Sequence, residues 1–252
     1  MLHFCRGPRC MHARLRQVAG INPHARKTLA RIRNACEQRG MKYLFVNTKG
    51  GVGKSTLATA FAVYLHDAGR RVAVLDADEQ LHSARAIAEA EPGITVVAEF
   101  EPNKIPDTIT RLADQHDDVV CDAPARLSDE TREMMVMADV AIFPMEPTIK
   151  CLRSTKESIE VLNYARTVTG GKPEHAWLVL NKAKKRTRLF REVEKLAPSL
   201  GLIVATEPIR DLQAFPEADQ QGTVVLRVKS DSPSFEKAKS DLKGLFGQIA
   251  EV

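Results

Sequence analysis

The chain carries the stretch Lys49-Gly50-Gly51-Val52-Gly53-Lys54-Ser55-Thr56, a run of glycines with a lysine at either end. Residues 43–47 before it are apolar and rich in strand formers, and residues 56–66 after it have apolar side chains at helical spacing. Glycine adopts positive φ without strain and leaves backbone N–H groups free to surround an anion, and the following helix points its positive dipole end at the same place. The stretch therefore predicts a phosphate-binding loop between a strand and a helix.

The end of this loop has the side chains that a nucleotide with bound Mg²⁺ requires. Lys54 is expected to reach the β- and γ-phosphates, and the hydroxyl of Ser55 stands where a ligand of Mg²⁺ belongs. Thr56 is expected to hydrogen-bond a more inner phosphate. A glycine-rich turn without a ligand is the alternative, and the strand and the helix on either side argue against it. The expected nucleotide-binding residues of the loop are Gly50, Gly51, Val52, Gly53, Lys54, Ser55 and Thr56.

Lys49 sets this loop apart from the ordinary phosphate-binding loop. The ordinary motif has a glycine at the position that Thr48 occupies here. The form KGGxGK[ST] instead resembles the deviant Walker A motif of the ParA/MinD family of ATPases. The resemblance implies that Lys49 crosses a dimer interface and contacts the phosphates held by the partner subunit, so that ATP forms part of the dimer contact.

Two later apolar segments end in aspartates, in the order that the resemblance implies. Residues 71–78 read as a strand that ends in two aspartates, Asp76 and Asp78. The family carries a similar pair, whose second carboxylate lies beside the attacking water. A solvated turn is the alternative at this place. Residues 118–124 resemble a Walker B segment, in which Asp122 would hold Mg²⁺ through water. The expected catalytic residues are thus Lys49, Lys54 and Asp78, and the expected metal residues are Ser55 and Asp122.

Residues 140–144 and 176–182 read as two more buried strands. The second ends in Asn181, and the resemblance implies that this side chain contacts the adenine base. Pro208 lies where the family lets the backbone lean on the same base, which is a weaker assignment. The resemblance covers about residues 42 to 226, and its later stretches look more like ParA-type partition proteins than like MinD.

Strands and helices alternate along the chain, which predicts an α/β fold, namely a three-layer α/β/α P-loop NTPase fold with a mostly parallel central sheet. No apolar run approaches the ~20 residues that span a bilayer, and the chain does not begin with a signal-peptide pattern, so a cytoplasmic location is expected. Two cysteines fall in expected core elements, and reduced thiols are the better interpretation. The five cysteines are Cys5, Cys10, Cys36, Cys121 and Cys151.

The charge is unevenly distributed and suggests two parts. Residues 1–40 carry nine of the 37 basic residues and one of the 32 acidic ones, for a net charge of +8, which leaves −3 for residues 41–252. Residues 41–252 are expected to form the ATPase domain. Residues 1–40 are expected to be a basic extension, either an arm or a segment that a natural start at Met41 omits. A zinc site is disfavoured there because its candidate ligands form one short cluster without paired CxxC spacing. Those candidates are His3, Cys5, Cys10 and His12.

A second basic cluster lies within residues 182–195. A helix is expected over residues 186–200, with Leu189, Val193, Leu196 and Leu200 as its buried stripe. The basic side chains on its other face are expected to contact DNA backbone without sequence preference, and the alternative is an ordinary solvated face. The expected DNA-binding residues are Lys182, Lys184, Lys185, Arg186, Arg188, Arg191 and Lys195.

The C-terminal residues 235–249 offer a competing function. Their apolar side chains share one helical face, with lysines on the other side, which resembles the basic amphipathic membrane anchor of MinD-like ATPases. Packing on the sheet is favoured over membrane binding, because Gly244 and Gly247 weaken an isolated helix by ~1 kcal/mol each.

Together these patterns predict a ParA-type ATPase that is cytoplasmic and nucleoid-associated. The resemblance implies an ATP-dependent homodimer that binds Mg²⁺ and non-specific DNA and is released when a ParB-like centromere-binding or cargo-adaptor protein stimulates hydrolysis. The alternatives are a MinD-like membrane-positioning ATPase, an electron-transfer ATPase of the nitrogenase iron-protein kind, and a non-enzymatic scaffold. Two departures from the family are Glu79-Gln80, where proline is common, and the loop sequence of residues 122–126.

Overall fold

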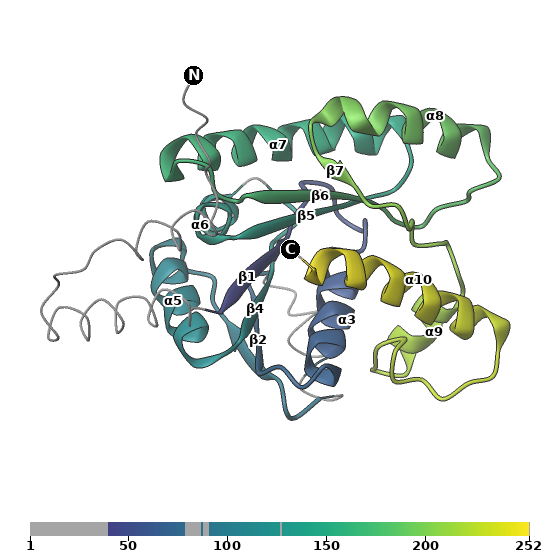
Figure 1. The fold of residues 1–252 in the computed structure, drawn as a ribbon, viewed down its shortest axis with the longest axis horizontal. Coiled ribbons are helices and arrows are strands. Elements are labelled where there is room, and N and C mark those ends of the chain that lie inside the picture. The colour runs from purple at the N-terminus through teal and green to yellow at the C-terminus, as the bar shows by residue number, and fades with distance from the viewer. Residues whose placement is uncertain (1–39, 79–86, 88–90, 127, 252) are drawn as a thin grey trace, which may run out of the picture. The chain divides into compact units, whose positions relative to one another are not determined.

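The structure is a computed structural model that describes residues 40–78, 87, 91–126 and 128–251. Its centre is a seven-stranded sheet in the order β3-β2-β4-β1-β5-β6-β7, and every neighbouring pair is parallel (Figure 1). The strands are β1 (Met41–Phe45), β2 (Val72–Asp76), β3 (Thr95–Ala98), β4 (Asp118–Asp122), β5 (Val140–Met145), β6 (His175–Leu180) and β7 (Ile203–Val204).

Helices cover both faces of this sheet, which confirms the three-layer α/β/α fold. Helices α5, α6, α7 and α8 pack on one face, and α3, α9 and α10 pack on the other. Their bounds are α3 (Lys54–Asp67), α5 (Ile105–Gln115), α6 (Asp129–Met137), α7 (Ile149–Thr169), α8 (Arg188–Leu196), α9 (Ala214–Gln220) and α10 (Pro233–Ala250), with short 3-10 turns η2 (Pro102–Lys104) and η3 (Ala197–Leu200).

The interiors of the central strands are apolar because each face of the sheet meets a helical layer. In β1, Leu44 points into the core beneath α5 and α6, whereas Tyr43 and Phe45 point into the core beneath α3 and α10. All three side chains are buried. This alternation along a strand places successive side chains on opposite faces of the sheet.

The carboxyl ends of β1, β2, β4 and β6 bring the expected site residues to one edge of the sheet. The chain leaves β1 into the phosphate-binding loop, and β2 and β4 end in Asp76 and Asp122. Asn181 follows the last residue of β6. In an open parallel sheet, ligands bind outside these ends of the strands, so the fold itself gathers the predicted site.

In helix α8, two of the four side chains expected to be buried are exposed instead. Its buried side chains are Phe190 and Val193, whereas Leu189 and Leu196 are 40% and 45% exposed. The helix begins at Arg188, where the hydroxyl of Thr187 accepts a hydrogen bond from the Phe190 N–H. The apolar face therefore continues from Val193 into η3, and the two exposed leucines lie on the outer surface.

Helix α10 packs on the molecule as expected. Its apolar side chains, among them Leu242, Phe246 and Ile249, are fully buried in the same core as α3. Phe246 lies against the ring of Phe61 from α3, with 5.1 Å between the ring centroids. The face that the membrane alternative needed is thus covered. In the part of the chain that the structure describes, no helix has the length and apolar character of a membrane span.

Several expectations fall outside the described residues. The basic extension of residues 1–40, apart from Gly40, lies there, together with the metal-site candidates and the departure at Glu79-Gln80. Cys121 and Cys151, by contrast, are described, and both are buried free thiols.

Candidate functional site

The glycine-rich loop takes the conformation that its sequence predicts. Gly51 and Gly53 have φ of +75° and +94°, in the left-handed region that favours glycine. Gly53 is the N-cap of α3, and its carbonyl accepts the hydrogen bond of Leu57 N–H at 3.0 Å. A Cβ atom at Gly53 would lie 2.1 Å from Nδ2 of Asn181, so a side chain at this position would have both to adopt an unfavourable φ and to displace Asn181. The helix N-terminus therefore opens directly onto the loop.

Lys54, the first residue of α3, is 6% exposed. Burial lowers the pKa of its amino group, while the carboxylates of Asp122 and Asp78 act in the opposite direction. A buried cation is stable only with compensating negative charge. Asp122 and Asp78 supply that charge, and the position of Lys54 at the start of α3 places its cation where a helix N-terminus binds an anion.

The two aspartates after β2 take different roles. Asp76 is fully buried, and its Oδ1 accepts a hydrogen bond from the backbone N–H of Asp78 at 3.0 Å. Asp78 is half-buried and lines the cavity beside the loop. Asp122 is fully buried at the end of β4. The expected water-positioning carboxylate thus faces the cavity, and Asp76 organises the turn that carries it.

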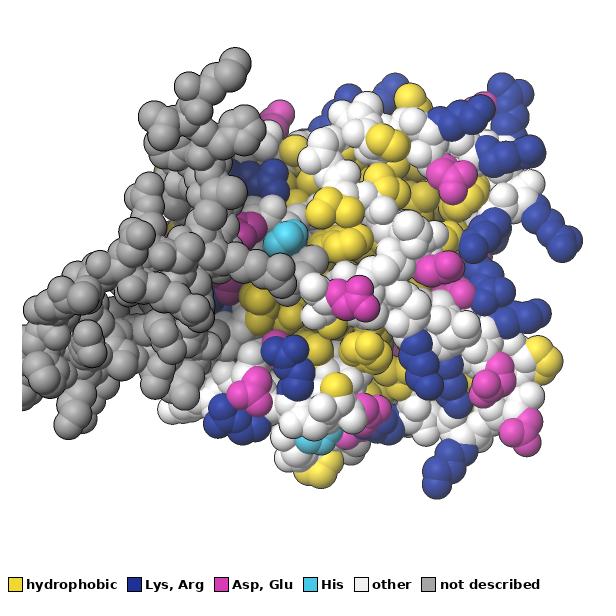
Figure 2. Space-filling view, in the orientation of Figure 1, with side chains coloured by type: hydrophobic (Ala, Val, Ile, Leu, Met, Phe, Trp, Pro, Cys, Tyr) yellow, Lys and Arg dark blue, Asp and Glu magenta, His cyan; other side chains and the backbone are white. Residues whose placement is uncertain are grey.

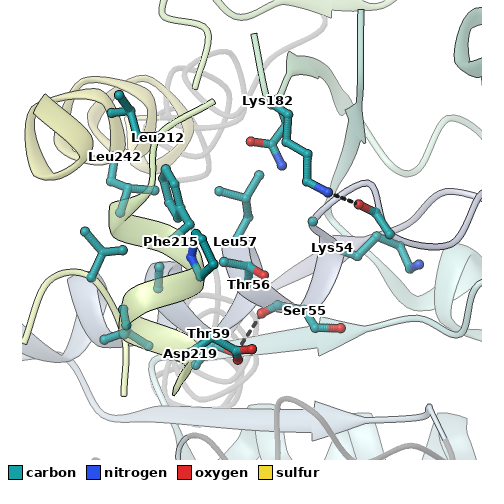
Figure 3. A pocket seen from close by; sticks show the side chains of 18 of the residues that line it. Lys54, Ser55, Thr56, Leu57, Thr59, Lys182, Leu212, Phe215, Asp219 and Leu242 are labelled. Atoms are coloured by element: carbon teal, nitrogen blue, oxygen red, sulfur yellow. Dashed lines mark hydrogen bonds between the residues drawn. The ribbon is translucent and has the colours of Figure 1, made fainter. Parts of the chain in front are cut away.

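A cavity of about 580 Å³ begins at the loop and extends between α3, α9 and α10. Figure 3 shows Lys54 and Ser55 on one side of it and Leu212, Phe215 and Leu242 on the other. A polar anion site next to an apolar wall suits a molecule with a phosphate end and an aromatic end. Pro208 is buried and does not belong to the lining of this cavity.

Asn181 and Lys182 both reach back to the loop. Nδ2 of Asn181 donates to the carbonyl of Val52 at 2.7 Å, and Nζ of Lys182 donates to the carbonyl of Gly51 at 2.7 Å. Both residues also line the cavity. Asn181 was expected at the base and Lys182 on a DNA-binding surface; here each side chain donates a hydrogen bond to the phosphate-binding loop, and Lys182 also lies 3.4 Å from Oε1 of Glu146.

Lys49 lies outside the lining of the cavity. Its amino group donates to Sγ of Cys151 at 3.0 Å and lies 3.8 Å from Oε2 of Glu146. The hydrogen bond to the Cys151 thiol raises the pKa of Lys49, and Glu146 adds to the effect. The side chain is 27% exposed. Lys49 is therefore a charged group at the surface beside the loop, in contrast to the buried Lys54.

The remaining expected DNA-binding residues are exposed in the segment before α8 and along the helix. Figure 2 shows Lys and Arg side chains gathered at the upper right of this view, the region of α8 and the segment before it in Figure 1. Two of them have acidic neighbours, since Lys184 lies 3.1 Å from Asp211 and Arg188 lies 2.7 Å from Glu192. The cluster keeps an excess of basic groups.

Sequence reasoning missed the side chains that build the far wall of the cavity. Arg210 lines the cavity and forms an ion pair with Asp241 of α10, which is 6% exposed, at 2.6 Å. Leu212 and Phe215 follow on the same segment. This segment belonged to the stretch that carried the resemblance, but nothing in its sequence indicated that it contacts α10.

The comparisons with known proteins agree with this geometry. The profile of the CobQ/CobB/MinD/ParA nucleotide-binding domain matches residues 43–225. The maintenance of carboxysome distribution protein A of Halothiobacillus neapolitanus is 30% identical over 188 residues, which cover 72% of this chain and 85% of that protein. The chromosome-partitioning ATPase Soj of Thermus thermophilus is 25% identical over 178 residues, which cover 59% of this chain and 72% of that protein.

A solved structure shares the fold. The septum site-determining protein MinD of Pyrococcus horikoshii, in complex with Mg-ADP, superposes with a TM-score of 0.64. The sequences are 20% identical, and the match covers 83% of this chain and 96% of that chain. Both proteins therefore have the same arrangement of sheet and helices.

Proposed function

Because this chain belongs to the CobQ/CobB/MinD/ParA family of nucleotide-binding domains, we propose that it is a ParA-type ATPase that works as a positioning switch. It binds ATP with Mg²⁺, pairs with a second copy of itself, and in that form binds DNA without sequence preference. Hydrolysis, stimulated by a ParB-like centromere-binding or cargo-adaptor protein, separates the pair. The protein acts in the cytoplasm, on the nucleoid.

The loop and the cavity support ATP as the nucleotide. Lys54 and the N–H groups of the loop bind the phosphates, because a buried cation and the start of α3 favour an anion at the same place. The apolar wall around Phe215 receives the base. Ser55 and Asp122 would hold Mg²⁺, which would supply positive charge to the phosphate oxygens.

Three residues act in hydrolysis: Asp78, Lys54 and Lys49. Asp78 lies at the cavity wall and orients a water molecule toward the terminal phosphate. Lys54 from the same subunit and Lys49 from the partner subunit neutralise the charge that develops on the phosphate oxygens. Both lysines act by electrostatic stabilisation, so each contributes only when it is held close to the phosphates.

The placement of Lys49 carries the proposal of a dimer. This lysine begins the loop, yet its amino group lies outside the cavity that Lys54 serves. A charged group that stands beside its own phosphate site at the surface is available to a nucleotide bound in a second copy. The relationship to the chromosome-partitioning ATPase Soj supports the same function.

The basic cluster before and along α8 supports DNA as the surface that the dimer binds. Arg188 is 90% exposed, and Arg191 and Lys195 are exposed as well. Flexible, exposed cations of this kind contact phosphates and release counterions, so binding should weaken steeply with salt. A helix that reads base edges is not needed for such binding.

Co-sedimentation with plasmid DNA tests the proposal. We expect DNA to carry down the protein with Mg-ATP, and much less of it with Mg-ADP or without nucleotide. The double variant Arg188→Glu/Arg191→Glu should lose this association and keep its affinity for ATP. A matched control, Lys237→Glu/Lys243→Glu on α10, makes the same change in net charge and should lose much less.

Two results would reject parts of the proposal. DNA binding that is equal in all nucleotide states would remove the switch. Equal losses in the two double variants would mean that overall charge, and not the α8 cluster, governs binding. Anionic liposomes in place of DNA test the MinD-like alternative, which requires ATP-dependent sedimentation with lipid that is weakened in Lys237→Glu/Lys243→Glu.

A further inference from the structure

We propose that Lys182 is a positioning residue of the nucleotide site, which turns the phosphate-binding loop toward its ligand by holding the carbonyl of Gly51. The proposal rests on nucleotide binding at this loop and replaces the expected role of Lys182 as a DNA contact. Its basis is the hydrogen bond from Nζ of Lys182 to the Gly51 carbonyl, 2.7 Å long. Figure 3 shows this bond at the rim of the cavity, beside Lys54.

The geometry of the peptide unit explains what this contact does. In a trans peptide, the carbonyl of one residue and the N–H of the next point in opposite directions. Lys182 holds the Gly51 carbonyl, and this directs the Val52 N–H away from Lys182. Asn181 holds the Val52 carbonyl at 2.7 Å and directs the Gly53 N–H in the same manner. Two adjacent side chains thus orient two successive N–H groups of the loop.

The backbone of Lys182 is itself held in an unusual conformation. Its φ is +51°, and it is the sole residue other than glycine with positive φ in the part of the chain that the structure describes. The left-handed region costs about 1 kcal/mol or more for such a residue. The next residue is fixed on both sides, since Ala183 N–H donates to the Ile209 carbonyl at 2.8 Å and the Ala183 carbonyl accepts from Asp211 N–H at 3.2 Å. These hydrogen bonds hold the backbone of residues 182–183 in the conformation that places Lys182 beside the loop.

Glu146 links Lys182 to Lys49. Its Oε1 lies 3.4 Å from Nζ of Lys182, and its Oε2 lies 3.8 Å from Nζ of Lys49. One carboxylate at the end of β5 thus lies between a lysine that holds the loop and a lysine that begins it. The negative charge of Glu146 attracts the amino group of Lys182 and holds it close to the Gly51 carbonyl.

Nucleotide affinity, measured by calorimetry for Mg-ADP and for adenosine, separates this role from a DNA contact. Lys182→Met removes the donor and keeps the aliphatic stem. We expect the affinity for Mg-ADP to fall about five- to twentyfold, the effect of losing one charged hydrogen bond. Adenosine lacks phosphates, so its affinity should stay within about twofold. Lys182→Arg keeps a cationic donor and should restore most of the affinity for Mg-ADP.

The control is Lys156→Met, which changes an exposed lysine on α7 and should leave both affinities unchanged. Lys182 is 48% exposed, so the variant should keep the thermal unfolding midpoint of the parent. If it does not fold, Lys182→Gln, with a shorter neutral donor, is expected to show an intermediate loss of Mg-ADP affinity.

Unchanged Mg-ADP affinity in Lys182→Met, with DNA binding weakened, would overturn the proposal and return Lys182 to the DNA surface. Equal losses for Mg-ADP and adenosine would also overturn it, because the loss would then not depend on the phosphates. If the parent protein does not bind Mg-ADP, the proposed function fails instead, so the two failures are distinguishable.

Discussion

Lys49 and Lys54 stand at the two ends of the same loop, and their amino groups lie in different surroundings. Lys54 is 6% exposed and lines the cavity, whereas Lys49 is 27% exposed and contacts Cys151 and Glu146 outside it. Burial makes a cation costly unless an anion compensates it, so Lys54 suits a phosphate within its own subunit. The surface position of Lys49 suits a contact made from one subunit to another.

Asp118 lies at the end of the sheet opposite the candidate site, and its burial predicts how protein stability depends on pH. It is fully buried at the start of β4 and forms an ion pair with Arg70, and burial raises the pKa of its carboxyl to about 6. The ordinary pKa of aspartate is about 3.9. Between these values the folded state binds more protons than the unfolded state, so this group makes stability fall as pH rises from about 4 to about 6.

We therefore expect Asp118→Asn to change the pH dependence of unfolding. The stability of the parent relative to the variant should decline by about 2 to 3 kcal/mol between pH 4 and pH 7, as two pKa units imply. Urea unfolding of both proteins at several pH values measures the difference. A difference that stays constant over this range would show that Asp118 is ionised in the fold throughout.

The individual contacts of the site were less predictable than its residue types. The loop motif identified Lys54 and Ser55 because the chemistry lies in consecutive residues. The bonds of Asn181 and Lys182 to the loop join positions about 130 residues apart in the sequence. Only the sheet order, in which β6 lies two strands from β1 with β5 between them, brings these residues to the same edge of the sheet.

At the scale of elements, the five inner strands were predictable because they are largely buried on both faces and so read as apolar runs. The edge strands β3 and β7 are short and partly exposed, and the sequence did not predict them. The face of α8 was not predictable either. Leu189 and Leu196 share a helical spacing, and so do Phe190 and Val193, and the sequence alone does not decide which pair faces the sheet. The fold decides it, since the chain enters α8 from the end of β6.

The corrected face of α8 predicts a contrast between neighbouring residues. Phe190→Ala removes a side chain that is 4% exposed, and we expect a loss of about 3 to 5 kcal/mol in the free energy of unfolding. Leu189→Ala changes a side chain that is 40% exposed and should stay within about 0.5 kcal/mol of the parent. Chemical denaturation of both variants tests this, and the reverse order would restore the face expected from the sequence.

The two glycines of α10 provide a second test of an element. Gly247 lies in the helix interior, and a Cβ atom there would have no neighbour within 4 Å. Gly247→Ala should therefore stabilise the protein by about 0.5 to 1 kcal/mol, the difference in helix propensity.

At Gly244, a Cβ atom would lie 3.2 Å from Cγ of Glu207, so Gly244→Ala is a comparison with a smaller expected gain. Thermal unfolding of the two variants gives the contrast. Destabilisation by Gly247→Ala would mean that α10 does not pack along its length as the structure has it.

At the scale of the whole molecule, the arrangement is that of a nucleotide-dependent switch. The parallel sheet gathers the loop, Asp78, Asp122 and Asn181 at one edge, and the same segment that borders the nucleotide cavity leads into the basic helix α8. The family that the loop motif predicted is confirmed by the profile match to residues 43–225. Dimerisation is the step that would turn this site into a switch, and it depends on Lys49.

The oligomeric state of Lys49→Ala with a non-hydrolysable ATP analogue, measured by analytical ultracentrifugation, tests this claim most directly. The parent protein should become a dimer with the analogue and Mg²⁺, and the control Lys104→Ala, which changes a lysine that is 60% exposed on η2, should do the same. Lys49→Ala should bind the nucleotide with the affinity of the parent and remain a monomer. A stable nucleotide-dependent dimer of Lys49→Ala would contradict the account.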